Sequence, residues 1–369
     1  MFRCILQFII TQLSLEYTMR CFLVLICVMG INFSASEKEK KSEVGSLVIG
    51  QGQMPNATTD DEGNIHVVFG SGDSIMYSLS NNHGNSFSKP ALVSILPKLV
   101  AFAMRGPQIA ATSNSLTIIA CNKSGDIFSY KKAKAKNWQS AGKVNDVDTV
   151  SKEGLMGLAA DGQTCYAVWL DLRDQHNKIF GAKLTDSGKS WSKNKMIYSS
   201  PDKTVCECCK PSVAIKGNDV FVMFRNWLNG NRDLYLIKSI DGGTNFAQAQ
   251  KLGNGSWALN GCPMDGGGLA VSNDGSVQTV WRRESKIFWS VPGKQETQLG
   301  EGKSCTIEST NGKNVYAWTE KGKVIVMKPN GTKESLGSGI LPIVKAVNND
   351  YVICVWENEK QIYSSLIKL

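Results

Sequence analysis

The sequence has few charged residues, few prolines and no long hydrophobic run beyond its first forty residues. Charged residues make up 20% of the chain and hydrophobic residues 42%, which excludes a disordered protein. The composition also excludes a collagen and a coiled coil. Because no second apolar span follows the first, a polytopic membrane protein is excluded as well.

Several common catalytic motifs are also missing from the sequence. It contains no P-loop, no dinucleotide-binding fingerprint, no HExxH zinc motif and no nucleophile elbow. The net charge of +9 comes mostly from lysines that are scattered singly, which is typical of a solvated surface. We therefore expect no nucleic-acid partner.

Glycine, in contrast, is abundant: 35 glycines against ten prolines are spread along the whole 369-residue chain. This distribution predicts many turns between short strands and hence an all-β fold.

The first 36 residues predict a signal peptide. Arg20 precedes the apolar run 21–33, and the small residues 34–36 offer a cleavage site, so Met19 is a candidate for the true start. We expect a polar linker at 37–44, a single domain at 45–369, and a secreted or periplasmic protein without a membrane span in the mature chain.

One pattern recurs along the chain: a β-branched and aromatic run that ends at a bulky residue followed by polar ones. Its seven copies are IHVVFGS (65–71), LTIIACN (116–122), CYAVWLD (165–171), VFVMFRN (220–226), VQTVWRR (277–283), NVYAWTE (314–320) and YVICVWE (351–357). Such units suit the blades of a β-propeller, which hide their apolar faces against one another. We predict one β-propeller of seven four-stranded blades, with six left open because the last two units are short. The strand at 45–50 is expected to complete the last blade.

Three turns carry a more specific pattern. Segments 80–87 (SNNHGNSF), 184–191 (LTDSGKSW) and 239–246 (SIDGGTNF) resemble the Asp-box, S-x-D-x-G-x-[ST]-[WF]. Together with WLDLR (169–173) and CECCKPS (206–212), they make the chain similar to exported bacterial Asp-box proteins of the sialidase-like group. The resemblance implies a sialidase-type propeller, in which Asp-boxes are structural turns.

Arginine is rare beyond residue 36, whereas lysine accounts for 33 of the 41 basic residues. We label the strands of each predicted blade A to D from the axis outward. All the arginines beyond residue 36 then fall in D-to-A connections or after B strands, which lie on the same face of the propeller. They are Arg105, Arg173, Arg225, Arg232, Arg282 and Arg283. Since guanidinium binds carboxylate, sulfate and phosphate in a bidentate manner, we predict an arginine-lined mouth for an anionic ligand, an acidic glycan above all. The alternative is that these arginines form structural bridges with acidic residues of the same loops.

Hydrolysis of the ligand is left open by the sequence. For an exo-sialidase-like hydrolase, position alone selects Asp171 or Glu284 as the acid/base and Glu320 or Glu357 to activate a nucleophile. Sialidases use a tyrosine nucleophile, so a tyrosine hydroxyl beside a glutamate is then expected to face the arginines. This interpretation requires no cofactor.

The cysteines support a different hypothesis. Cys206, Cys208 and Cys209 lie in one D-to-A connection and Cys262 in the next, so four sulfur atoms approach the same mouth. One alternative is a disulfide between Cys262 and one of the other three. The other is a soft-metal site for Cu(I), completed by Met264, or a redox-linked site. A scaffold that binds another protein is a third functional alternative, because propellers host many unrelated functions.

Overall fold

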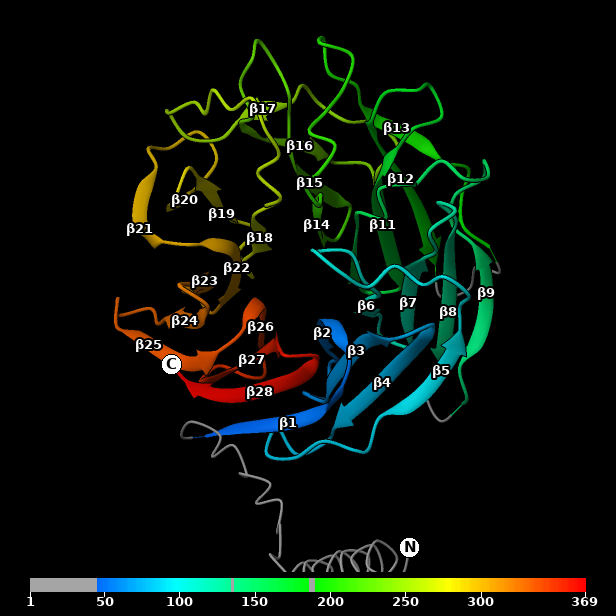
Figure 1. Ribbon diagram of the computed structural model, residues 1–369, viewed down its shortest axis with the longest axis vertical. Helices are drawn as coiled ribbons and strands as arrows, with labels where there is room; N and C mark the ends of the chain where they lie inside the picture. The colour runs from blue at the N-terminus through cyan, green and yellow to red at the C-terminus, as the bar shows by residue number, and fades with distance from the viewer. Residues whose placement is uncertain (1–44, 134–135, 186–189) are drawn as a thin grey trace, which may run out of the picture. The chain divides into compact units, whose positions relative to one another are not determined.

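The computed structural model describes residues 45–369, except 134–135 and 186–189. The predicted signal peptide, the candidate start Met19 and the linker 37–44 lie outside the described residues. The described part of the chain forms seven four-stranded antiparallel sheets arranged as a ring, which confirms the predicted seven-bladed β-propeller (Figure 1). Within this part, no helix is long and apolar enough to cross a bilayer.

Each blade consists of four consecutive strands, except that the last blade takes its outer strand from the start of the chain. The A strands are β2 (Gln53–Thr59), β6 (Gln108–Ala111), β10 (Met156–Asp161), β14 (Ser212–Lys216), β18 (Gly268–Val271), β22 (Lys303–Thr310) and β26 (Ile340–Ala346). The B strands are β3 (Ile65–Ser71), β7 (Ser115–Cys121), β11 (Thr164–Asp171), β15 (Asp219–Arg225), β19 (Val277–Arg283), β23 (Lys313–Glu320) and β27 (Tyr351–Asn358).

The outer strands follow the same order. The C strands are β4 (Ser74–Ser80), β8 (Ile127–Ala133), β12 (Lys178–Thr185), β16 (Leu234–Ser239), β20 (Lys286–Ser290), β24 (Lys323–Met327) and β28 (Gln361–Lys368). The D strands are β5 (Ala91–Ile95), β9 (Gln139–Lys143), β13 (Lys195–Tyr198), β17 (Gln250–Lys251), β21 (Thr297–Glu301), β25 (Lys333–Ser338) and β1 (Ser46–Gln51).

The middle of each B strand is buried because neighbouring blades cover it on both faces. All seven residues of β7 are buried, and so are all but one of β11 and β15. A large aromatic residue near the end of most B strands fills the space between blades, and Trp169, Trp318 and Trp356 are among the largest fully buried side chains. The recurring bulky residue of the sequence pattern is therefore a core residue.

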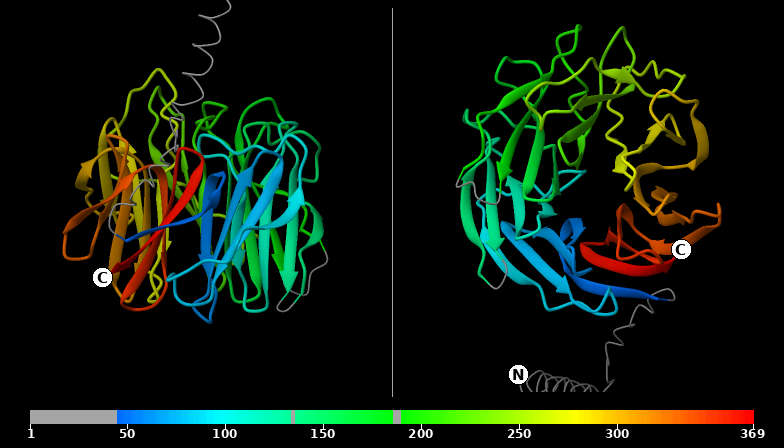
Figure 2. Two further views of the ribbon diagram at one scale, coloured as in Figure 1. Left: turned by 60° about the horizontal axis from the view of Figure 1, so that its bottom comes forward. Right: turned by 180° about the vertical axis from the view of Figure 1, so that it is seen from behind.

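The connections from D to A strands are of two kinds. Four are long and irregular: 96–107, 144–155, 199–211 and 252–267. The other three are single glycines, Gly52, Gly302 and Gly339. A Cβ atom on Gly302 or Gly339 would lie 2.7 or 2.2 Å from the Trp318 or Trp356 ring, and the two glycines have φ angles of +145° and +155°. Only glycine fits here, because the chain crosses directly over the aromatic residue of the next blade. Seen from the side, longer loops rise above the strands at one face of the ring (Figure 2).

Two of the segments that resemble Asp-boxes form the same hydrogen-bonded turn between C and D strands. In segment 80–87, the Gly84 N–H donates to Ser80 Oγ at 2.8 Å and the Ser86 N–H to Asn82 Oδ1 at 3.0 Å. In segment 239–246, the corresponding bonds go from Gly243 to Ser239 at 2.9 Å and from Asn245 to Asp241 at 2.8 Å. Asn82 therefore serves as an acceptor in place of the aspartate. Part of the third segment, 184–191, lies outside the described residues.

The ring is closed by β1, which pairs antiparallel with β28, the C strand of the last blade. Ile49 of β1 is 5% exposed and packs in a cluster with Phe69 of the first blade and Val355 of the last, whereas the neighbouring Val48 is 54% exposed. Closure covers the edge that β28 would otherwise expose.

We expect Ile49→Ala to lower the free energy of unfolding by about 2–4 kcal/mol, because it leaves a cavity at the junction that closes the ring. Val48→Ala is the matched control, with an expected loss below about 1 kcal/mol, since the side chain is exposed on the same strand. Urea unfolding of both variants measures the difference. Equal losses would mean that packing of β1 does not hold the ring closed.

Candidate functional site

The seven A strands surround a central cavity of about 350 Å³. Its wall combines small apolar residues with polar groups from different blades, among them Asn56, Gln108, Lys210, Thr306 and Lys345. We call the end of this cavity where the D-to-A connections cross the mouth. A cavity of this size with a few convergent polar groups is typical of a small-ligand site.

Lys210 is the cation of this cavity that has no carboxylate partner. It precedes β14 and is half-buried, and its ammonium donates a hydrogen bond to Gln108 Oε1 on the second blade at 2.6 Å. No carboxylate of the described residues lies within ion-pair distance of Lys210. Lys345, in contrast, pairs with Glu308 at 3.1 Å. Burial, and to a smaller extent the charge of Lys345, lowers the pKa of Lys210 to about 8.

The mouth is built from three residues in left-handed conformation at the starts of A strands: Met54, Ser304 and Leu341, with φ angles of +55°, +56° and +55°. The backbone N–H of each donates to a side chain of the preceding blade. The acceptors are Glu357 Oε2 for Met54 at 2.8 Å, Asp265 Oδ2 for Ser304 at 2.7 Å and Thr319 Oγ1 for Leu341 at 3.2 Å.

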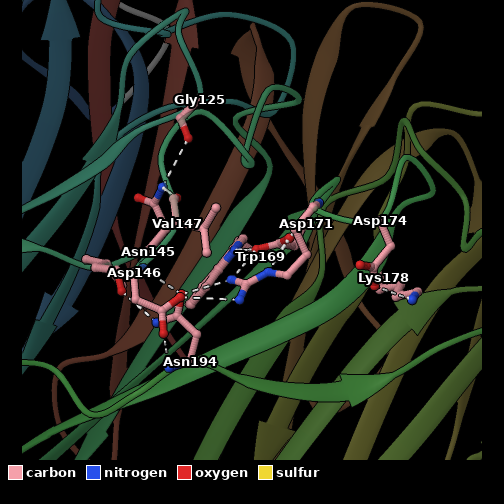
Figure 3. A network of polar contacts seen from close by, with 11 residues as sticks. Gly125, Asn145, Asp146, Val147, Trp169, Asp171, Asp174, Lys178 and Asn194 are labelled. Atoms are coloured by element: carbon pink, nitrogen blue, oxygen red, sulfur yellow. Dashed lines mark hydrogen bonds and ion pairs between the residues drawn. The ribbon is translucent and has the colours of Figure 1, made fainter.

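Two of the predicted catalytic carboxylates, Glu357 and Asp171, are buried in internal hydrogen bonds, and neither lines the cavity. Glu357, 7% exposed, holds the junction between the last and first blades. Asp171, 1% exposed, accepts hydrogen bonds from Trp169 Nε1 and from the backbone and Nε of Arg173, each at 2.9 Å. Figure 3 shows this network, which Asp146 and Asn194 from neighbouring loops join. The Arg173 guanidinium also reaches Asn194 at 3.1 Å and Asp146 at 3.3 Å.

The other two predicted catalytic residues do not line the cavity either. Glu320 accepts a hydrogen bond from Trp318 Nε1 at 3.2 Å, and Glu284 is exposed in the turn after β19. Among the described residues, neither Glu320 nor Glu357 is hydrogen-bonded to a tyrosine hydroxyl. The tyrosine–glutamate pair expected of a sialidase-type hydrolase is thus not formed by these candidates.

All six predicted ligand-binding arginines lie at the mouth end of their blades, but each already has internal partners and none lines the central cavity. Four pair with carboxylates: Arg105 with Glu153, Arg173 with Asp171, Arg232 with Glu207 and Arg283 with Glu296. Arg225 donates to the backbone carbonyls of Asp265, Arg232 and Arg282, and Arg282 to those of Pro263 and Glu284. Arg225, Arg232 and Arg283 line one small hollow, and Arg225 also donates to the Arg282 carbonyl. Ligand binding by the arginines stays a prediction.

The sulfur atoms, in contrast, do converge as the sequence predicted. Cys208 and Cys262 form a disulfide between adjacent D-to-A connections. Cys206 Sγ lies 3.3 Å from Cys209 Sγ and 3.7 Å from Cys208 Sγ, and Arg232 Nη1 donates to Cys206 Sγ at 3.1 Å. The hydrogen bond with Cys209 and the nearby guanidinium groups hold the pKa of Cys206 below its ordinary value, while burial raises that of Cys209.

Metal ligation by these residues stays a prediction. The sulfur atoms of Cys206, Cys208 and Cys209 all lie within 4.8 Å of one another, which is compatible with a shared soft ion once Cys208 is reduced. In the disulfide-bonded state described here, Cys208 and Cys262 offer no thiolate. Met264 is 42% exposed, and its neighbour Asp265 donates its backbone N–H to Cys209 Sγ at 3.5 Å.

Three residues of the mouth were not singled out from the sequence: Gln108, Lys210 and Asp265. Burial raises the pKa of Asp265, whose carboxylate accepts from Ser304 and lies near Arg225. All three stand at or just before the start of an A strand, where the chain turns toward the axis. A search for polar residues at these positions would have found them.

No family profile and no curated protein sequence matches the chain. Solved structures do match it. The BP39L lectin from Burkholderia pseudomallei aligns with a TM-score of 0.63 and 9% identity, over 86% of this chain and 96% of that one. The β-propeller domain of the Trilobed protease from Pyrococcus furiosus aligns with a TM-score of 0.50 and 11% identity, over 87% and 97%. NanB sialidase from Streptococcus pneumoniae aligns with a TM-score of only 0.46 and 11% identity, over 89% and 70%, and this likeness carries no argument.

At such identities the likeness shows the fold alone. The fold and the similar solved structures define the protein as a seven-bladed β-propeller. Membership of the sialidase-like Asp-box group stays a prediction from the sequence.

We expect Glu357→Ala to lower the free energy of unfolding by about 1–3 kcal/mol, because the buried Met54 N–H loses its acceptor. Glu357→Gln keeps an acceptor oxygen and is expected to lose less. Chemical unfolding of both variants provides the comparison. A fully stable Glu357→Ala variant would show that the carboxylate does not hold the mouth, and would return it to the candidates for catalysis.

Proposed function

We propose that the protein binds a small anionic ligand, with an acidic sugar as the first class to consider, in its central cavity. The observation that carries this proposal is Lys210, an ammonium group in the cavity wall without a carboxylate partner among the described residues. A half-buried cation with a single neutral acceptor is poorly compensated for its lost hydration. An anion in the cavity would supply the missing charge.

The size and polarity of the cavity support a ligand of monosaccharide size. Its volume of about 350 Å³ lies at the lower end of the range typical of small-molecule sites. Asn56 and Thr306 place amide and hydroxyl groups in the same wall, and such groups suit sugar hydroxyls. The Burkholderia pseudomallei protein of similar fold is named a lectin, which favours sugars as the first ligands to test.

This proposal assigns the ligand to Lys210 rather than to the six arginines. Each guanidinium group is already hydrogen-bonded within the protein, and Arg225 is 1% exposed. All three guanidinium nitrogens of Arg225 donate to backbone carbonyls, so direct ligand binding would require Arg225 to give up an internal bond and leave a buried acceptor unsatisfied. The arginines support the mouth instead, by holding the long connections in place.

We expect Lys210→Gln to weaken binding of N-acetylneuraminate or galacturonate by about tenfold or more, because a charge-assisted hydrogen bond is lost. Lys216→Gln is the matched control: Lys216 ends the adjacent strand β14 and is exposed. Isothermal titration calorimetry with the full chain, and with galactose as the neutral sugar, measures the effect. Failure of every acidic sugar to bind, or equal binding by the two variants, would refute the proposal.

Binding should also weaken as the pH rises through about 8, because Lys210 loses its proton there. The charged groups that share the cavity wall are Lys345, paired with Glu308, and Asp265. In the Lys210→Gln variant this pH dependence should disappear. An unchanged affinity of the wild-type protein between pH 7 and 9 would contradict a contact between ligand and Lys210.

A further inference from the structure

The four cysteines at the mouth differ sharply in exposure. We call Cys206 and Cys209 the inner pair and the bond between Cys208 and Cys262 the outer disulfide. Cys206 and Cys209 are 0% and 2% exposed, and Cys208 is 7% exposed, whereas Cys262 is exposed to solvent. The inner pair is reduced, and the outer disulfide presents one sulfur atom to the outside.

We propose that these four cysteines form a thiol–disulfide relay, in which the buried inner pair delivers two electrons through the exposed outer pair to a disulfide in solution. Three distances carry this inference. Cys206 Sγ lies 3.7 Å from Cys208 Sγ of the outer disulfide and 3.3 Å from its inner partner Cys209, so it stands between the two. Arg232 Nη1, 3.1 Å from Cys206 Sγ, supplies positive charge to the sulfur that attacks first.

The guanidinium of Arg232 is held firmly in this position. It lies 4.6 Å from the centre of the Trp227 ring, donates to the Leu259 carbonyl at 3.3 Å and pairs with Glu207 at 3.3 Å. The spacing of the inner pair, Cys206-Glu207-Cys208-Cys209, is that of a Cys-x-x-Cys dithiol, which suits reversible disulfide formation.

The relay balances in two exchange steps. Cys206 gives up its proton to solvent, and its thiolate attacks Cys208 Sγ. The Cys206–Cys208 bond forms and the Cys208–Cys262 bond breaks. Cys262 leaves with the electron pair and takes up a proton. Cys209 then gives up its proton and attacks Cys206 Sγ; the Cys206–Cys209 bond forms, and Cys208 leaves with the electron pair and is protonated. One disulfide has been exchanged for another, and no outside oxidant is consumed.

The outer pair is now a dithiol and can reduce an external disulfide. Cys262, as the exposed sulfur, attacks the disulfide and forms a mixed disulfide, with release of one external thiol. Cys208 then attacks Cys262, which restores the outer disulfide and releases the second thiol. The external disulfide is reduced by two electrons, and the inner pair is oxidised by two.

The test uses the full chain, freed of reductant, with oxidised glutathione as the probe. After timed exposure, remaining thiols are blocked with N-ethylmaleimide and disulfides are mapped by mass spectrometry. The relay predicts that a Cys206–Cys209 disulfide accumulates, that two glutathiones are released per protein, and that the mixed disulfide forms at Cys262. Cys121, Cys305 and Cys354, which are buried and reduced, serve as internal controls and should stay unreacted.

Two variants distinguish the relay from direct oxidation of the inner pair by the external disulfide. In Cys208→Ala/Cys262→Ala, oxidation of Cys206 and Cys209 should slow by about tenfold or more, because the buried pair loses its exposed partner. Arg232→Gln retains all four cysteines and should slow the exchange by about tenfold as well, with Arg232→Lys partly restoring it. Circular dichroism verifies that each variant is folded.

Three outcomes would overturn the proposal: an inner pair as inert as the control cysteines, oxidation at the same rate in wild type and the double alanine variant, or a mixed disulfide at Cys206 instead of Cys262. Tight binding of Cu(I) by the reduced protein without formation of the Cys206–Cys209 disulfide would also overturn it, in favour of a metal site. None of these outcomes affects sugar binding at Lys210, so the two proposals can fail independently.

Discussion

The arrangement of the seven blades around the central cavity depends on the pairing of β1 with β28, which closes the ring. A closed ring fixes the distance of each A strand from the axis, since every blade is wedged between two neighbours through its buried B strand. The A strands therefore cannot collapse onto one another, and a cavity remains between them. Residues that are far apart in the chain, such as Gln108 and Lys210, meet across this cavity only because the ring holds their blades in place.

The mouth shows why charged residues of a propeller are a poor guide to its chemistry. Four D-to-A connections are long and irregular, so they bring many backbone carbonyls and N–H groups that no strand neighbour can satisfy. Arg225 satisfies three carbonyls, while Glu357 and Asp265 each satisfy an N–H of the following blade. Arg225 supports a long connection through the Asp265 carbonyl. Glu357 and Asp265 instead support the strands that follow single-glycine connections.

The residues proposed for ligand binding and for thiol–disulfide exchange come largely from a single segment, residues 205–211. Cys206 and Cys209 face Arg232 and Asp265 on one side of the connection, while Lys210 enters the cavity on the other. The segment is held at both ends, by the pairing of Val205 with Asn226 and by β14. Fixed ends favour defined side-chain positions, which both proposed chemistries require.

The repeated hydrophobic pattern, the glycine content and the terminal strand predicted the propeller, its seven blades with six left open, and the closure of the ring, because these depend on local periodicity and on a chain that returns to its start. The convergence of Cys262 with Cys206, Cys208 and Cys209 was also predictable, since adjacent D-to-A connections are neighbours in any propeller. Only the tertiary structure decided that Arg105 pairs with Glu153, that Arg283 pairs with Glu296, and that Lys210 is left without a carboxylate partner among the described residues. The physical reason is that these partners lie on irregular connections, whose paths follow no sequence repeat. The path of each connection depends on the buried polar groups of the blades that still need hydrogen-bond partners.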